Sequence, residues 1–92
     1  MIETPVTIRN LMGLHARAAN MLAHRSSQFK SVIELEDPTT ARRSDAKSII
    51  QLLMMAAGKD TKLILRIHGE DQDQASKVLK ELFNNGFGEP CG

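Results

Sequence analysis

The run Gly13-Leu14-His15-Ala16-Arg17 lies where the pattern of the chain changes from strand to helix. Apolar and polar residues alternate before it, and alanine-rich helical spacing follows it. The run therefore places His15 at a helix N-terminus. Backbone N–H groups at such an end lack partners and carry a partial positive charge, so they can hold a phosphate on the imidazole, and Arg17 can add a charge-assisted contact. A solvated helix cap is the competing interpretation of this histidine.

The chain has 92 residues, with three Phe and neither Trp nor Tyr, which predicts one small domain with an aliphatic core and no deep cavity. Its net charge of +1 gives no reason to expect nucleic acid as a partner, so we expect proteins. The single Cys91 cannot form an internal disulfide. Neither a signal-peptide pattern nor a membrane-length apolar run is present in the sequence, and we expect a soluble, cytoplasmic protein without membrane insertion.

Periodicity predicts seven elements in the order βαββαβα. Strands are expected over 2–8, 31–36, 40–44 and 62–68. Helices are expected over 16–28 and 49–57, and an apolar stripe over 75–83 predicts a last helix that ends near Asn84-Asn85-Gly86. A turn at Asp37-Pro38-Thr39 joins the second and third strands into a hairpin, and Gly58 is expected to cap the second helix. The acidic run over 70–73 is expected to supply the first turn of the last helix, where negative charge is favourable.

This order, with polar residues on one face of the strands, predicts an α+β fold: an open-faced β-sandwich in which three helices cover one face of a four-stranded sheet. We expect one domain over 1–88 and a flexible C-terminal tail over 89–92. The chain is expected to be loosely held from Phe87 onward, because Gly86, Gly88 and Pro90 interrupt regular structure.

Three segments in this order resemble HPr, the family of histidine-containing phosphocarriers of the bacterial phosphoenolpyruvate-dependent sugar phosphotransferase system. They are Gly13-Leu14-His15-Ala16-Arg17-Ala18-Ala19, Asp45-Ala46-Lys47-Ser48-Ile49-Ile50 and Gly69-Glu70-Asp71. The resemblance covers nearly the whole chain. One departure is Ala18, because the family usually has proline there. Proline in a first helical turn pre-sets φ, so we expect alanine to loosen this turn by about 0.5–1 kcal/mol without abolishing it.

The resemblance implies that His15 accepts a phosphoryl group from an enzyme I-like donor and passes it to enzyme IIA-like acceptors, while Arg17 stabilises the phosphate. It also implies phosphorylation at Nδ1, a choice of nitrogen that the sequence alone does not make. Such a protein is a stoichiometric carrier, not an enzyme, and needs no cofactor. An ordinary histidine, with a pKa of about 6.5, is mostly the unprotonated nucleophile at neutral pH.

Two other functions stay open at this point. One is a carrier in a regulatory, nitrogen-related branch of the same system, which signals without moving sugar. The other is a small-molecule-sensing α+β regulatory module, which the same element order can support. The second leaves His15 and Arg17 without a role.

Ser48 has two interpretations. Serine is a favoured N-cap, so it is expected to begin the second helix. The resemblance adds regulatory phosphorylation, because in many relatives a metabolite-regulated serine kinase, with a matching phosphorylase, acts on this serine, whereas many others keep the serine without such a kinase. A phosphate at Ser48 would lie at the helix N-terminus and beside any partner surface.

The second helix carries more apolar residues than one buried stripe can hold, so some of them are expected to be exposed. The resemblance points to Leu14, Ile49, Leu53 and Met54 as the partner-binding residues. A fully buried helix is the alternative. His24, His68 and Cys91 have neither the spacing nor the neighbours of metal ligands, so we expect no metal site and treat both histidines as surface residues. We expect a monomer.

Overall fold

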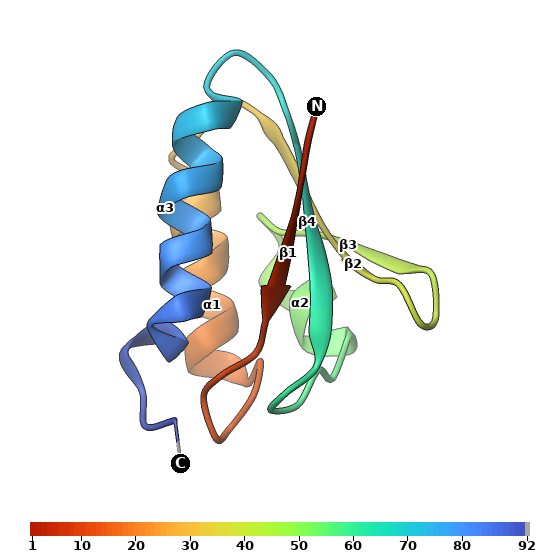
Figure 1. The fold of residues 1–92 in the computed structure, drawn as a ribbon, viewed down its shortest axis with the longest axis vertical. Helices are drawn as coiled ribbons and strands as arrows, with labels where there is room; N and C mark the ends of the chain where they lie inside the picture. Colours follow the sequence, from red (N-terminus) through yellow and green to blue (C-terminus); the bar gives the residue numbers. More distant parts are fainter. Residues whose placement is uncertain (92) are drawn as a thin grey trace.

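Four strands form one antiparallel sheet in the order β1-β4-β2-β3 (Figure 1). The structure is a computed structural model that describes residues 1–91. The strands are β1 (Ile2–Thr7), β2 (Val32–Asp37), β3 (Arg42–Asp45) and β4 (Lys62–His68). Pro5, which lacks an N–H, lies in the edge strand β1, where the loss of one ladder bond is tolerated. The predicted four-stranded sheet is confirmed.

Three helices cover one face of this sheet and leave the other face open (Figure 1). They are α1 (Ala16–Ser26), α2 (Ile49–Met54) and α3 (Gln72–Asn84), and a short 3-10 turn, η1 (Gly86–Gly88), follows α3. The predicted open-faced α+β sandwich is therefore confirmed. Small side chains on α1, including Ala18 and Ala19, are fully buried together with Leu65 of β4, so the helix packs closely in the core.

The second helix is shorter than predicted. It ends at Met54, with Met55 as its C-cap, and not at residue 57. The left-handed residue that follows is Ala56, with φ of 50°, so the expected cap at Gly58 is wrong. The apolar pattern runs past the point where the backbone leaves the helix, because Ala57, which follows the helix, is also buried.

The end of the chain packs more tightly than predicted. Phe87 is fully buried and lies edge-on to Phe83, with 5.0 Å between the ring centroids. The expectation that the chain is loose from Phe87 onward is wrong, because burial of this ring outweighs the neighbouring glycines. Beyond it, the amide of Leu11 donates to the carbonyl of Pro90 at 3.0 Å. The division into 1–88 and a tail stays a prediction, and Gly92 lies outside the described residues.

The acidic run before α3 has the predicted role only in part. Asp71 is the N-cap residue, but its carboxylate makes no bond to its own helix. It accepts hydrogen bonds from the amides of Lys30 and Ser31 and from the Ser31 hydroxyl, and these bonds lower the pKa of Asp71. Only Asp73 supplies acidic charge to the first turn. Asp71 therefore fastens the start of α3 to the segment that enters β2.

The turn between β1 and α1 depends on Gly13. Its φ is 68°, a left-handed conformation, and a Cβ at this position would lie 2.6 Å from the carbonyl oxygen of Ala57 and 2.9 Å from the Cα of Gly58. The next residue, Leu14, donates its amide to that same carbonyl at 2.8 Å. Only glycine allows this approach, which fixes the start of α1 against the segment after α2.

We expect Gly13→Ala to lower the free energy of unfolding by about 2 kcal/mol or more, because it combines backbone strain with a collision against backbone atoms. Urea titration measures this loss. Gly58→Ala is the matched control, since a Cβ there meets no atom within 4 Å, and its effect should stay within about 0.5 kcal/mol. Equal effects of the two substitutions would contradict this account of Gly13.

Candidate functional site

His15 is the N-cap residue of α1, as predicted. Its backbone is extended, with φ of −85° and ψ of −176°, and its side chain does not cap the helix. The first intrahelical bond runs from the amide of Ala19 to the carbonyl of His15 at 2.8 Å. The three earlier amides, those of Ala16, Arg17 and Ala18, have no helical carbonyl to reach, so their N–H groups point toward the space beyond the helix end.

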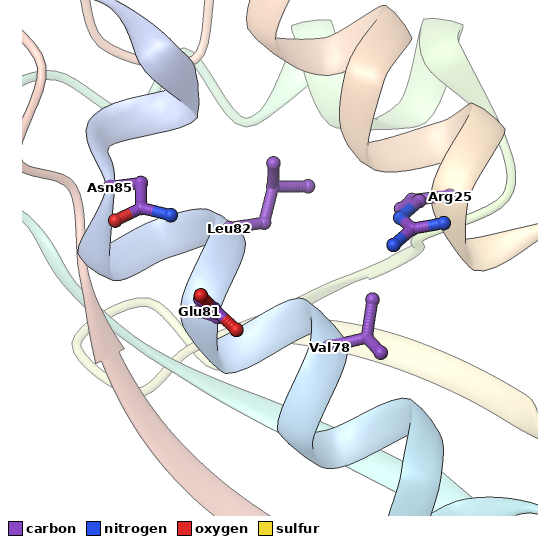
Figure 2. A pocket seen from close by; sticks show the side chains of 5 residues that line it. All are labelled: Arg25, Val78, Glu81, Leu82 and Asn85. Atoms are coloured by element: carbon purple, nitrogen blue, oxygen red, sulfur yellow. The ribbon is translucent and has the colours of Figure 1, made fainter.

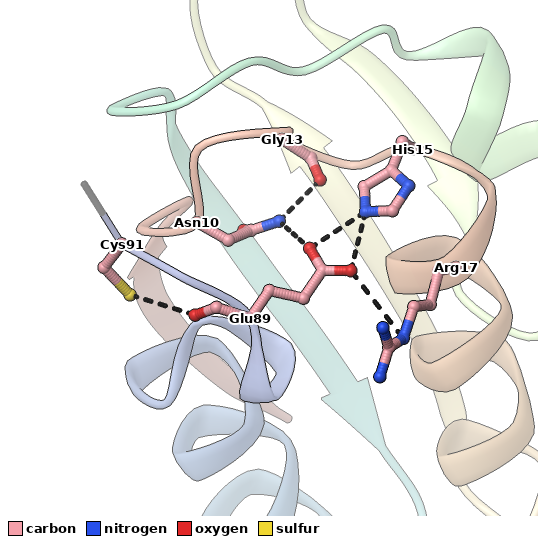
Figure 3. A network of polar contacts seen from close by, with 6 residues as sticks. All are labelled: Asn10, Gly13, His15, Arg17, Glu89 and Cys91. Atoms are coloured by element: carbon pink, nitrogen blue, oxygen red, sulfur yellow. Dashed lines mark hydrogen bonds and ion pairs between the residues drawn. The ribbon is translucent and has the colours of Figure 1, made fainter.

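The imidazole of His15 is held by Glu89 from the C-terminal segment (Figure 3). Its Nε2 lies 2.9 Å from Oε1 and 2.8 Å from Oε2 of the carboxylate. The side chain of Glu89 is only 7% exposed, whereas that of His15 is 27% exposed. The second ring nitrogen is turned away from Glu89 (Figure 3).

Asn10 fixes the other side of the carboxylate. It is fully buried, and its side-chain amide donates to the carbonyl of Gly13 and to Oε1 of Glu89, both at 2.8 Å. Because both of these partners only accept hydrogen bonds, the NH2 group of Asn10 has to face them. Asn10 thereby connects the turn before α1 with the C-terminal segment.

Arg17 lies at the edge of the site. Its Nε is 3.9 Å from Oε2 of Glu89, and its side chain is 72% exposed. This is a long and mostly solvated ion pair, so it constrains the guanidinium weakly. The side chain lies on the same helical turn as the open amides and can turn toward an anion beside His15.

The carboxylate of Glu89 is kept ionised by its neighbours. Its hydrogen bond with His15 is the largest effect that lowers the pKa of Glu89, burial opposes it, and the Asn10 bond and the charges of His15 and Arg17 add to the lowering. An ionised carboxylate only accepts hydrogen bonds, so it can orient an N–H and stabilise a positive charge on the ring. The site thus combines the imidazole of His15, the carboxylate of Glu89 that binds it and the N-terminal amides of α1.

The other residues predicted to have a function lie on or near α2. Ser48 is its N-cap, and its hydroxyl oxygen accepts from the amide of Gln51 at 3.3 Å, as the cap interpretation predicts. Leu52 is the only buried residue of α2, so the alternative of a fully buried helix is wrong. Leu14 is 3% exposed and belongs to the core, so it is not an exposed partner-binding residue.

The apolar side chains around α2 form an exposed surface, which we call the α2 surface. It consists of Leu11, Met12, Ile49, Ile50, Leu53 and Met54. The prediction from sequence included three of these residues. The backbone hydrogen bond from Leu14 to Ala57 joins the turn that carries Leu11 and Met12 to the segment after α2. We call this contact the junction, and both the turn and α2 lead into it.

The remaining candidates lie elsewhere. His24 and His68 are exposed, as predicted, and residues 1–91 contain no group of three or more His, Cys, Asp or Glu side chains placed to hold a metal. A shallow pocket between α1 and α3, lined in part by Arg25 and Glu81 (Figure 2), contains neither His15 nor Ser48. Within the described residues, no helix has the length and apolar character needed to cross a bilayer.

The sequence patterns did not identify Asn10 or Glu89. Asn10 was given no role, and Glu89 fell in the expected tail. Phe87 is the signal that could have identified Glu89. A large apolar residue such as Phe87 predicts that the chain packs on the core there, and Glu89 follows only two residues later. No local pattern identifies Asn10, because its partners are a carbonyl and a distant carboxylate.

The lowered pKa of Glu89 predicts a dependence of stability on pH. A carboxyl whose pKa falls below its usual value of 4.5 stabilises the fold above that value, and the stabilisation is lost as the pH falls through the lowered pKa of the folded protein. The difference in unfolding free energy between the wild type and Glu89→Gln should therefore be largest near neutral pH and shrink on acidification.

Urea titrations across this pH range measure that difference. Glu81→Gln removes a carboxylate from the exposed surface of α3 and serves as the control for net charge alone. A wild-type advantage over Glu89→Gln that grows as the solution becomes more acidic would contradict the assignment.

Comparison with known proteins places this geometry in a family. Residues 2–85 match the family described as PTS HPr component phosphorylation site. The "Phosphocarrier protein HPr" of Xylella fastidiosa is 42% identical over 89 residues, which is 97% of this chain and 98% of the relative. The protein of the same name from Neisseria meningitidis serogroup A is 39% identical over the same shares of the two chains.

Solved structures agree with this result. The crystal structure of HPr-C-His from Thermoanaerobacter tengcongensis superposes with a TM-score of 0.91 at 32% identity, covering 98% of this chain and 99% of that one. The histidine-containing phosphocarrier protein of Mycoplasma has a TM-score of 0.84 at 29% identity, over 92% and 96% of the two chains. With a match over most of its length and relatives at about two-fifths identity, this chain belongs to the HPr family of phosphocarrier proteins.

Proposed function

We propose that this protein carries a phosphoryl group on His15, which it accepts from a phosphorylated enzyme I-like donor and passes to enzyme IIA-like acceptors. The observation that carries the proposal is the position of the imidazole. His15 is the N-cap residue of α1, one ring nitrogen is held by Glu89, and the other is turned away from Glu89 (Figure 3), at a helix end whose first amides have no helical carbonyl as partner. A nucleophile next to an anion-binding helix end suits a group that must be both accepted and released.

The helix end and Arg17 share the work of holding the phosphate. A phosphoryl group on His15 brings a charge of about −1.5 to −2, and the partial positive charge of the α1 N-terminus attracts it. Arg17 adds a mobile full charge, because its existing ion pair is long and its side chain is mostly exposed. The site is open to solvent on one side, so the group stays accessible to an acceptor.

The α2 surface is our proposed docking site for donor and acceptors. Methionine side chains such as Met12 and Met54 adapt to surfaces of different shape, which suits a carrier that has to bind more than one protein. Ile49, Leu53 and Met54 are the residues named from sequence, and Leu11, Met12 and Ile50 extend the site. A partner that covers this surface also reaches His15 at the adjoining junction.

Ser48 is the proposed site of regulation. It is the residue immediately before Ile49, at the edge of the α2 surface, and it already caps the helix. A serine kinase that phosphorylates it would place charge where a partner has to remove water, while the helix end itself would tolerate that charge.

The direct test is incubation with a bacterial enzyme I and phosphoenolpyruvate, followed by intact-mass measurement. We expect one acid-labile phosphate on the wild type and none on His15→Ala, which should stay folded by circular dichroism because His15 is not part of the hydrophobic core. His24→Ala, at an exposed residue of α1, is the matched control and should be phosphorylated normally. Phosphate on His15→Ala at the normal rate would rule out His15 as the carrier residue.

Ser48→Asp tests the proposed regulation. A carboxylate is a good N-cap, so the melting temperature should be unchanged or slightly higher. Binding to enzyme I should weaken by about fivefold or more, equivalent to about 1 kcal/mol, because the new charge faces an apolar contact. Ser48→Asn keeps the cap without charge and should bind normally. Unchanged affinity for Ser48→Asp, measured by calorimetry, would show that partners dock elsewhere.

A further inference from the structure

Glu89 is held in place by contacts that come both before and after it in the chain. Before it, Phe87 anchors the chain in the core. After it, the carbonyl of Pro90 accepts from the amide of Leu11 at 3.0 Å, and Asn10 donates to the carboxylate itself. The 7% exposed carboxylate therefore meets His15 in a fixed position and not by the chance approach of a free tail.

This geometry selects one tautomer of His15. Both carboxylate oxygens lie within 2.9 Å of Nε2. An ionised carboxylate has no proton to donate, so the proton of a neutral imidazole has to sit on Nε2 and point at Glu89. The lone pair is then on Nδ1, the nitrogen that is turned away from Glu89 in Figure 3. The same arrangement of carboxylate and imidazole orients the general base in serine hydrolases and the ligands of many metal sites.

We propose that Glu89 is a positioning residue for phosphoryl transfer, which holds His15 as the Nε2–H tautomer and pairs with the positive ring that forms when Nδ1 is phosphorylated. The proposal rests on the carrier function proposed above and adds a role for a residue outside α1. In this proposal, the contact between His15 and Glu89, which are 74 positions apart in the sequence, determines which ring nitrogen is the nucleophile.

The transfer step balances without moving a proton at His15. The lone pair of Nδ1 forms the new bond to phosphorus while the bond from phosphorus to the donor breaks, and that electron pair stays with the donor. Nε2 keeps its proton, so the ring becomes positively charged and Glu89 neutralises it. In transfer to an acceptor, the Nδ1–phosphorus electrons return to the ring, which becomes neutral again with its proton still on Nε2.

The position of Glu89 also lets its carboxylate attract the positive ring without lying next to the incoming phosphate. A carboxylate near the incoming phosphate would repel it, but Glu89 lies on the Nε2 side of the ring, away from Nδ1 (Figure 3). Arg17, 3.9 Å from Oε2, reduces the remaining negative charge on that side. The ring therefore carries its stabilising anion on one side and its phosphate on the other.

The test compares the wild type, Glu89→Ala and Glu89→Gln in two measurements. Nitrogen chemical shifts of isotope-labelled histidine report the tautomer in the free protein. Quench-flow phosphorylation by enzyme I and phosphoenolpyruvate reports the rate, and titration of the carrier separates kcat from KM. Glu81→Ala, at an exposed glutamate of α3, is the control.

We expect the wild type to show a proton on Nε2 and Glu89→Ala to show a mixture of tautomers. We expect both Glu89 variants to lose about tenfold to 100-fold in kcat, the loss that is typical when the partner of a metal-ligating histidine is removed, with little change in KM because the Glu89 side chain is buried. Glu89→Gln keeps the size of the side chain and guards against loss of the local fold in the alanine variant.

A kcat within about twofold of wild type in both variants would overturn the role of Glu89, since the smallest loss expected is about tenfold. So would an unchanged tautomer in folded Glu89→Ala. Failure of the wild type to accept phosphate overturns the proposed function itself, together with this extension of it. The two failures are distinguishable because the first requires a wild type that is phosphorylated normally.

Discussion

The close contact between Gly13 and the backbone at Ala57 and Gly58 is the constraint on which the arrangement around His15 depends. With no side chain at Gly13, the turn after β1 lies directly on the segment after α2, and the amide of Leu14 bonds to the carbonyl of Ala57. Helix α1 begins two residues later. His15 is thus placed at a helix end and beside the α2 surface by a single backbone junction. In our proposal, a partner that binds the exposed apolar side chains therefore lies next to the imidazole.

The site resolves two opposite requirements of a phosphoryl carrier. In our proposal, the imidazole needs a free lone pair before transfer, and after transfer the same ring bears a positive charge and an anionic group. The structure distributes these requirements over the two ring nitrogens. Nε2 faces the carboxylate of Glu89, which suits an N–H and a positive ring, whereas Nδ1 is turned away from that anion. In our proposal, the helix amides and Arg17 then hold the phosphate.

The sequence pattern predicted those helices and strands whose conformation depends mainly on residues close to one another in the sequence. Strand β4 was predicted with its observed bounds because Leu63, Leu65 and Ile67, which are buried, alternate with residues that are less buried. The position of His15 as the N-cap of α1 was predictable for the same reason, since a change of period marks a helix start.

The errors lie where tertiary contacts override local pattern. Helix α2 ends early because Ala56 adopts a left-handed conformation in the packed junction. Leu14 is buried although it belongs to a turn, where no period assigns it to a face. Glu89 was unpredictable from spacing because its partners, Asn10 and His15, are more than 70 residues away in sequence. Contacts of this kind become visible only when the C-terminal segment is placed against the helix end.

The identity of the phosphorylated nitrogen tests the central claim most directly. Phosphorus–nitrogen NMR correlation on the phosphorylated protein, prepared with isotope-labelled histidine, shows which atom bears the group. We predict that phosphorus couples to Nδ1 of His15, while Nε2 carries a proton that is protected from exchange with solvent by its hydrogen bond to Glu89. Phosphorus on Nε2 of His15, or on His24 or His68, would contradict the account.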